Sequence, residues 1–207
     1  MTMENVKKDS EVKKMKDVIL TAHKDVYYVA AAMLYNACRE ADIGFVKKED
    51  INERLLEEVK SKHKNIYIIG VRVMPDNAAE TAAALERLAN AGKKVKWYLL
   101  EDRVQPDVDP KAMNVIKNFI VPVKKGGNMV DAIKENEPVI LEDYAYLKEV
   151  YDSLDRAETT NMGFTKKTAK EKDRHPVAEY VYYRYDQHFT FRDDHAGERL
   201  KEMIRTI

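Results

Sequence analysis

The chain has 207 residues, of which 44% are hydrophobic and 35% charged, a composition typical of a globular protein rather than a disordered one. Its 36 basic and 36 acidic residues cancel, which excludes the overall positive charge of a dedicated nucleic-acid coat protein, so any nucleic-acid binding must depend on a local patch. A single cysteine, Cys38, excludes an internal disulfide framework and a cysteine-based zinc site, and it fits a reducing compartment.

The first 16 residues form a charged arm of both signs that lacks the apolar stretch of a signal peptide. The longest apolar run, YYVAAAMLY at 27–35, is far shorter than the roughly 20 residues that a membrane-spanning helix needs. We therefore expect a soluble, cytoplasmic protein without a membrane partner.

The first predicted elements are a strand and a helix. The segment DVILTA at 17–22 is continuously apolar, as expected for a strand buried on both faces. From Asp25 to about Ala41 the apolar residues follow helical spacing, and Asp25 is well placed as the helix N-cap.

The same alternation continues along the chain. Further strands are predicted at 65–73, 93–100 and 118–123, and a short strand or a connection at 42–48. Further helices are predicted at 48–62, 76–92 and 129–136. The helix at 76–92 should be capped by Asp76 or Asn77 and end at Gly92. Parallel strands need helical crossovers that cover the sheet, so we predict an α/β fold with a parallel sheet and helices on both faces.

In such a sheet, ligands bind beyond the carboxyl ends of the strands. His23, residues 70–72 and residues 99–102 each follow an apolar strand and should gather at that edge.

The pattern changes after Pro138. A long helix is predicted at 140–158, with Tyr144, Leu147, Tyr151 and Leu154 on one core-facing stripe. We divide the chain into a charged arm at 1–16, an α/β domain at 17–160, a polar linker at 161–175 and a helical extension at 176–207.

The order and spacing of these strand ends resemble the DHH phosphoesterase superfamily, which includes RecJ nucleases, oligoribonucleases, pyrophosphatases and cyclic dinucleotide phosphodiesterases. Its members open with a strand, then His-x-Asp-x-Asp and a helix rich in small residues, much like AHKDVYYVAAAMLY at 22–35. The resemblance covers roughly residues 17–160 and implies the N-terminal domain fold of that superfamily.

The resemblance also implies a ligand set that this chain largely lacks. His23 and Asp25 match the first His and Asp of the opening motif, but Tyr27 stands at its second Asp. Gly70, or Val71 if the register slips by one residue, stands where the next strand should supply an aspartate.

The later ligand positions of the family also mostly lack metal-ligating residues in this chain. Leu99, Leu100 and Glu101 align with the Asp-His-His motif, and Asp155 matches a late aspartate. The family's chemistry uses two divalent cations, usually manganese, which need many carboxylate and imidazole ligands. We therefore expect no catalytic residues and no cofactor, with His23, Asp25 and Asp155 as vestigial metal ligands, and manganese only if residual activity exists.

These three residues also have ordinary structural explanations. Asp25 can serve as a helix cap, His23 can bond to the backbone at the strand end, and Asp155 can lie on a helix surface. A second acidic and histidine cluster (Asp186, His188, Asp193, Asp194 and His195) could bind a metal, but its spacing favours a polar loop that caps the last helix.

Three segments are candidates for binding. Lys124 and Lys125 beside Gly126 and Gly127 could contact phosphate, as could the basic segment 165–174. Tyr182 and Tyr183, within EYVYYRYDQHFTF at 179–191, could stack on single-stranded bases, although such aromatic residues more often form core or a protein interface.

The resemblance points to a catalytically inactive RecJ-like protein that binds or holds partners. One branch of the superfamily joins the GINS complex and the MCM helicase in DNA replication, which would place this chain near the nucleoid and near single-stranded nucleic acid. The alternatives are a divergent metal-dependent phosphoesterase that uses His23, Asp25, Asp155 and Asp102 or Glu101, and a nucleotide sensor that binds without cleaving.

Overall fold

The structure is a computed structural model that describes residues 17–22, 25–38, 41–101, 107–124, 127–139, 141, 144–145, 147–148 and 151–152. The predicted charged arm, polar linker and helical extension lie outside the described residues, as does the end of the predicted α/β domain beyond residue 152.

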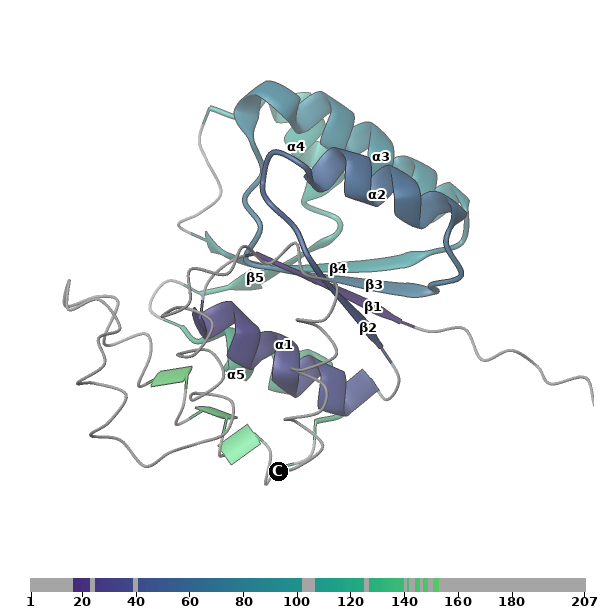
Figure 1. The fold of residues 1–207 in the computed structure, drawn as a ribbon. Helices are drawn as coiled ribbons and strands as arrows, with labels where there is room; N and C mark the ends of the chain where they lie inside the picture. Colours follow the sequence, from purple (N-terminus) through teal and green to yellow (C-terminus); the bar gives the residue numbers. More distant parts are fainter. Residues whose placement is uncertain are drawn as a thin grey trace, which may run out of the picture.

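Five parallel strands form one sheet in the order β2-β1-β3-β4-β5 (Figure 1). Their bounds are β1 (Val18–Thr21), β2 (Asp42–Phe45), β3 (Asn65–Ile69), β4 (Lys94–Leu100) and β5 (Ile120–Val123). The chain first adds β2 on one side of β1 and then β3 on the other, so the strand order changes direction between β1 and β3.

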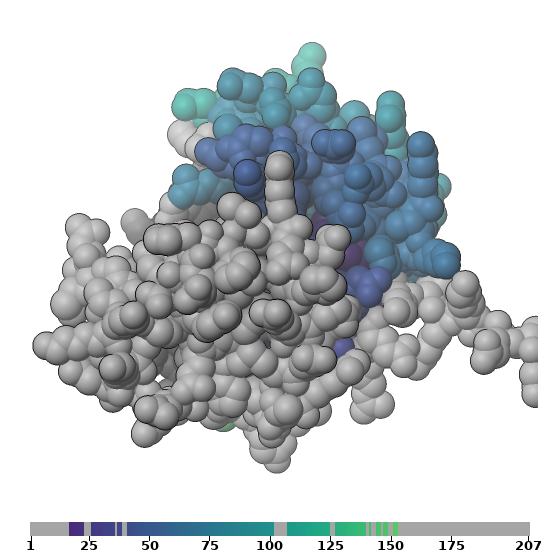
Figure 2. Space-filling model, viewed as in Figure 1, coloured from purple at the N-terminus to yellow at the C-terminus, as the bar shows by residue number. Residues whose placement is uncertain are grey.

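Helices cover both faces of the sheet (Figure 1), which confirms the predicted α/β fold. One face carries α1 (Asp25–Cys38) and α5 (Met129–Asn136). The other carries α2 (Ile51–Lys60), α3 (Ala78–Asn90) and α4 (Pro110–Ile116), and a single 3-10 turn, η1 (Pro75–Asn77), leads into α3. Figure 2 shows α2 and α3 forming the outer layer on their side of the molecule.

The sheet separates two apolar cores. Tyr67 and Ile69 of β3 face the core under α1 and α5, whereas Ile66 and Ile68 face the core under α2, α3 and α4. Successive strand residues point to opposite faces, so a strand buried on both must be apolar at every position. This requirement explains the continuous apolar runs in the sequence.

Helix α1 is apolar on every side, and every residue from Val26 to Tyr35 is at most 7% exposed. A helix of this kind belongs to the interior rather than to a surface. The helix begins at Asp25, as predicted, and the proposed capping role of the Asp25 side chain stays a prediction.

Several predicted boundaries need correction. Strand β3 ends at Ile69 rather than at 73, because Gly70 turns the backbone with a φ of 68°. Asn77 occupies the N-cap position of α3 but makes no side-chain cap hydrogen bond. Gly92 follows α3 with a φ of 73°, in line with its predicted role.

Helix α4 was not predicted. It begins at Pro110, directly after Asp109, whose Oδ2 accepts a hydrogen bond from the backbone N of Ala112 at 3.1 Å. A capping aspartate followed by proline at the first helical position is a recognisable helix start.

The predicted helix after Pro138 is described only in part. Residues 141, 144–145, 147–148 and 151–152 are helical, and Leu147 and Tyr151 are buried, as the predicted stripe requires. Leu154 lies outside the described residues. No helix in the described part of the chain is long and apolar enough to span a membrane.

Candidate functional site

The candidate site lies where the carboxyl ends of β1 and β3 meet. The backbone N of Ala22, just after β1, donates to the carbonyl of Ile69 at 3.0 Å. Gly70, just after β3, donates from its backbone N to the carbonyl of Tyr98 in β4, also at 3.0 Å. The described strand ends that were predicted to gather therefore do so. In open parallel sheets, ligands bind where the strand order changes direction.

At this point the ring of Tyr27 lies directly over Gly70. A Cβ atom added to Gly70 would be 2.5 Å from Cζ of Tyr27 and closer still to two other ring carbons. The Tyr27 side chain comes from the first turns of α1 and is only 6% exposed. The aromatic ring thus occupies the space that any side chain at position 70 would need.

Tyr27 and Gly70 are therefore a coupled pair. Gly70 also has a positive φ, a conformation that other L-amino acids adopt at a cost of about 1–2 kcal/mol. The sequence resemblance predicts aspartates at both positions, whereas the structure has the Tyr27 ring over Gly70. The geometry does not fit a two-metal centre at these two positions.

The end of β4 offers no ligands at its two leucines. Leu99 is 1% exposed and packs in the core under α2, α3 and α4, while Leu100 packs against the opposite core. Glu101, the third position of the aligned motif, is exposed. Val71, the alternative to Gly70, is buried, and its carbonyl accepts a hydrogen bond from Nε1 of Trp97 at 2.8 Å.

The remaining predicted site residues are only partly described. His23, Asp102, Asp155, Lys125, Gly126, Tyr182, Tyr183 and the cluster at 186–195 lie outside the described residues. Within the described ranges, no three His, Cys, Asp or Glu side chains gather in a way that could hold a metal ion.

The loop between β5 and α5 reaches the same edge of the sheet. Lys124 is exposed there, and the backbone N of Gly127 donates to the Lys124 carbonyl at 2.7 Å. A Cβ at Gly127 would lie 2.8 Å from that carbonyl oxygen, so the turn requires glycine. Asn128 caps α5 through Oδ1 and donates from Nδ2 to Oδ1 of Asp152 at 2.6 Å. A carboxylate therefore stands beside the start of α5, and phosphate binding by Lys124 stays a prediction.

A polar network lies under α1 and α5 and was not foreseen from the sequence. The hydroxyl of Tyr98 and Nζ of Lys96 each donate to Oε1 of Glu137 at 2.6 Å. Burial raises the pKa of Tyr98, and the hydrogen bond to Glu137 raises it further. Burial also raises the pKa of Tyr67, to which Cys38 is hydrogen-bonded.

Cys38 belongs to the same buried region. Burial raises the pKa of its thiol from the ordinary 9.0 to about 11, even though the hydrogen bond with Tyr67 lowers it. The thiol is therefore protonated near neutral pH and is a poor nucleophile.

No protein-family model matches the sequence, and no curated protein matches it either. A solved structure described as an uncharacterized protein from Helicobacter pylori G27 is similar, with a TM-score of 0.51 and 10% sequence identity. The similarity shows the fold alone. It covers 93% of this chain and 63% of that protein, so the chain spans less than two thirds of its length.

Proposed function

We propose that this chain is a non-hydrolysing binding protein, a degenerate relative of the DHH phosphoesterases that holds partners instead of cleaving a substrate. The observation that supports the proposal most strongly is the packing of Tyr27 on Gly70. Two metal ions require several carboxylate and imidazole ligands around a shared space. An aromatic ring at this point, with leucines at the end of β4, replaces such ligands by apolar packing.

The partners proposed for the chain are proteins of the replication complex, of the GINS and MCM type, in the cytoplasm or at the nucleoid. This part of the proposal rests on the resemblance of the sequence to the RecJ-like branch. Tyr182 and Tyr183 are the proposed contact residues, because aromatic side chains dominate the energetics of protein interfaces.

The proposal is tested with the full chain, manganese and a short single-stranded oligonucleotide. Thermal stability and the length of the oligonucleotide are followed in the same samples. A ligand that binds only the folded state raises the apparent stability, so binding and cleavage are read separately. We expect no shift with manganese and no shortened products.

Two results would overturn the proposal. Manganese-dependent cleavage that disappears in Asp25→Asn would make the chain a phosphoesterase. Stabilisation by a mononucleotide, added in place of the oligonucleotide and left uncleaved, would make it a sensor, and the phosphates would then be sought at Lys124 and Gly127. The partner assignment is tested separately by titrating purified GINS and MCM subunits from the same source against the wild-type chain and Tyr182→Ser/Tyr183→Ser.

A further inference from the structure

The edge of the sheet opposite the Tyr27–Gly70 pair brings together two lysine-rich loops. The loop KSKHK at 60–64 starts with the last residue of α2 and leads into β3. The loop that starts at Gly92 continues into the first three residues of β4, as GKKVK at 92–96. Because β3 and β4 are adjacent and parallel, both loops lie at the amino edge, on the right in Figure 1. The backbone N of Lys94 donates to the carbonyl of Lys64 at 2.9 Å, so the loops are in direct contact.

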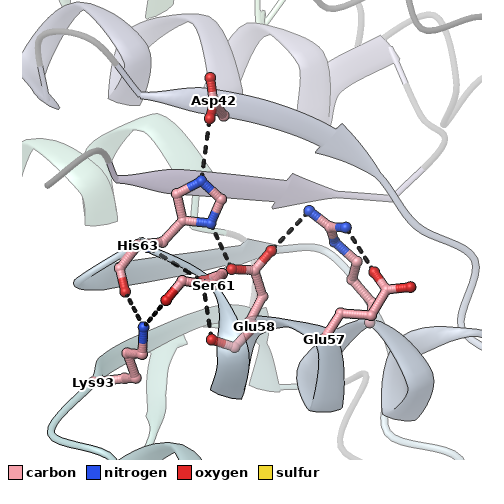
Figure 3. Close-up of polar contacts among 7 residues, drawn as sticks. Asp42, Glu57, Glu58, Ser61, His63 and Lys93 are labelled. Carbon is pink, nitrogen blue, oxygen red and sulfur yellow. Dashed lines mark hydrogen bonds and ion pairs between the residues drawn. The ribbon is translucent and has the colours of Figure 1, made fainter.

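Side chains hold the first loop in a fixed shape (Figure 3). Nζ of Lys93 donates to the carbonyls of Ser61 and His63, at 2.7 and 2.6 Å. The His63 ring lies between two carboxylates, with Nδ1 2.5 Å from Glu58 and Nε2 3.1 Å from Asp42. These contacts tie the loop to α2, β2 and the start of β4, so the backbone that carries its lysines is held in place.

The outward-facing charge of these loops is positive. Lys60, Lys62, Lys64 and Lys94 are exposed, and we call these four residues the amino-edge lysine patch. The stretches 59–75 and 87–100 contain no aspartate or glutamate. The adjacent Glu58 is 1% exposed and is paired with Arg54 at 2.7 Å as well as with His63. Asp42, which contacts His63, has a side chain that is 42% exposed, so the four exposed lysines have one partly exposed carboxylate beside them.

We propose that the amino-edge lysine patch binds the phosphate backbone of a nucleic acid. Lysine contacts to phosphate provide affinity and position without reading sequence, and a row of lysines on one rigid edge suits an evenly spaced polyanion.

A protein partner fits this surface less well. Lysine is depleted in protein interfaces, whose centres use aromatic and apolar anchors. Leu56, one helical turn before Lys60, is 39% exposed, and the other exposed large apolar side chain in the described part of the chain is Leu141. A membrane surface would also need apolar insertion or a second anchor for stable binding.

The test uses the full chain and the fluorescence anisotropy of a labelled oligothymidylate over a range of salt concentrations. The variant Lys64→Gln/Lys94→Gln removes two charges from the patch. The control Lys48→Gln/Lys111→Gln also removes two positive charges, but at the carboxyl edge. Lys48 is exposed in the loop before α2, and Lys111 is exposed in the first turn of α4. Circular dichroism confirms that both variants are folded.

We expect Lys64→Gln/Lys94→Gln to weaken binding and to lower the slope of log K against log salt by about 1.4, or about 0.7 for each lost phosphate contact on a single strand. The control should retain the wild-type slope. The proposal is overturned if the oligonucleotide does not bind at low salt, or if both variants weaken it equally. Binding to polyglutamate or to phosphatidylserine vesicles, but not to the oligonucleotide, would also overturn it.

This inference does not depend on the proposed loss of hydrolysis. The patch lies at the opposite edge of the sheet, and binding and cleavage are measured separately. Failure of one proposal therefore leaves the other standing.

Discussion

At the scale of single residues, the contact between Tyr27 and Gly70 leads to a direct prediction. Gly70→Ala should destabilise the protein by about 3 kcal/mol, because the new Cβ meets the Tyr27 ring in a core with no spare room and the backbone has a positive φ. Gly92→Ala is the matched control. Gly92 has a similar φ of 73° but has nothing within 4 Å of an added Cβ. Gly92→Ala should therefore lower the free energy of unfolding, measured in urea, by only about 1–2 kcal/mol.

A double-mutant cycle isolates the steric part of this effect. In a Tyr27→Ala background, Gly70→Ala should lower the free energy of unfolding only by the cost of the positive φ, about 1–2 kcal/mol. If Gly70→Ala lowers the free energy of unfolding equally with and without the Tyr27 ring, the ring does not fill the space above residue 70.

The partly buried thiol of Cys38 leads to a prediction on pH. Its folded-state pKa of about 11 lies above the ordinary 9.0, so folding favours the protonated thiol. The stability that this provides is fully present below pH 9 and is lost as the pH rises toward 11. Alkylation of the native protein by iodoacetamide should therefore rise with a midpoint near pH 11. The denatured protein, as the control, should titrate near the ordinary value, and a native midpoint close to 9 would show that the thiol is not desolvated.

Some features of the candidate site could be predicted from the sequence, whereas the contact at its centre could not. The lack of a metal-ligating carboxylate or imidazole at Tyr27, Gly70, Leu99 and Leu100 could be read directly from the sequence. The packing of Tyr27 on Gly70 could not, because it depends on how α1 sits on the sheet and on the backbone turn after β3. Side-chain contacts between segments distant in sequence leave no local pattern.

At the scale of elements, the end of α2 is held by a buried carboxylate. Glu58 pairs with both Arg54 and His63 and is 1% exposed, whereas Glu57 pairs with the same Arg54 and its side chain is 56% exposed. Arg54 keeps its contact with Glu57, and His63 keeps its contact with Asp42, when Glu58 is removed. Glu58→Ala still removes the buried contact of both partners, so it should destabilise the protein by about 2–3 kcal/mol.

The control for this prediction is Glu57→Ala. An exposed ion pair contributes little, so this variant should change the free energy of unfolding by about 0.5 kcal/mol or less. Urea denaturation of the two variants measures the difference directly. Equal effects would mean that Glu58 does not anchor the loop that carries the amino-edge lysine patch.

Most elements could be predicted because their apolar periods are strong. Helix α4 was missed because it is short, with only Ala112 and Ile116 buried, so the Asp109-Pro110 start was its main signal. The amino-edge lysine patch was missed for a different reason. Its two loops are separated by β3 and α3 and come together only through the pairing of β3 with β4.

At the scale of the whole molecule, the two cores share one sheet and should unfold together. Trp97, the single tryptophan, is fully buried in the core under α2, α3 and α4, while Cys38 packs against the core under α1 and α5. Tryptophan fluorescence and thiol accessibility should therefore show coincident urea transitions, as for a two-state protein. Separate midpoints would mean that one helical layer unfolds before the other.

At the carboxyl edge between β1 and β3, the Tyr27 ring occupies space that a pair of metal ions would need. The most direct test is anomalous diffraction from crystals of the full chain soaked in manganese. We expect the Tyr27 ring over Gly70 and no manganese peak between the ends of β1, β3 and β4. A manganese peak at that edge, with Tyr27 turned away from Gly70, would contradict this expectation.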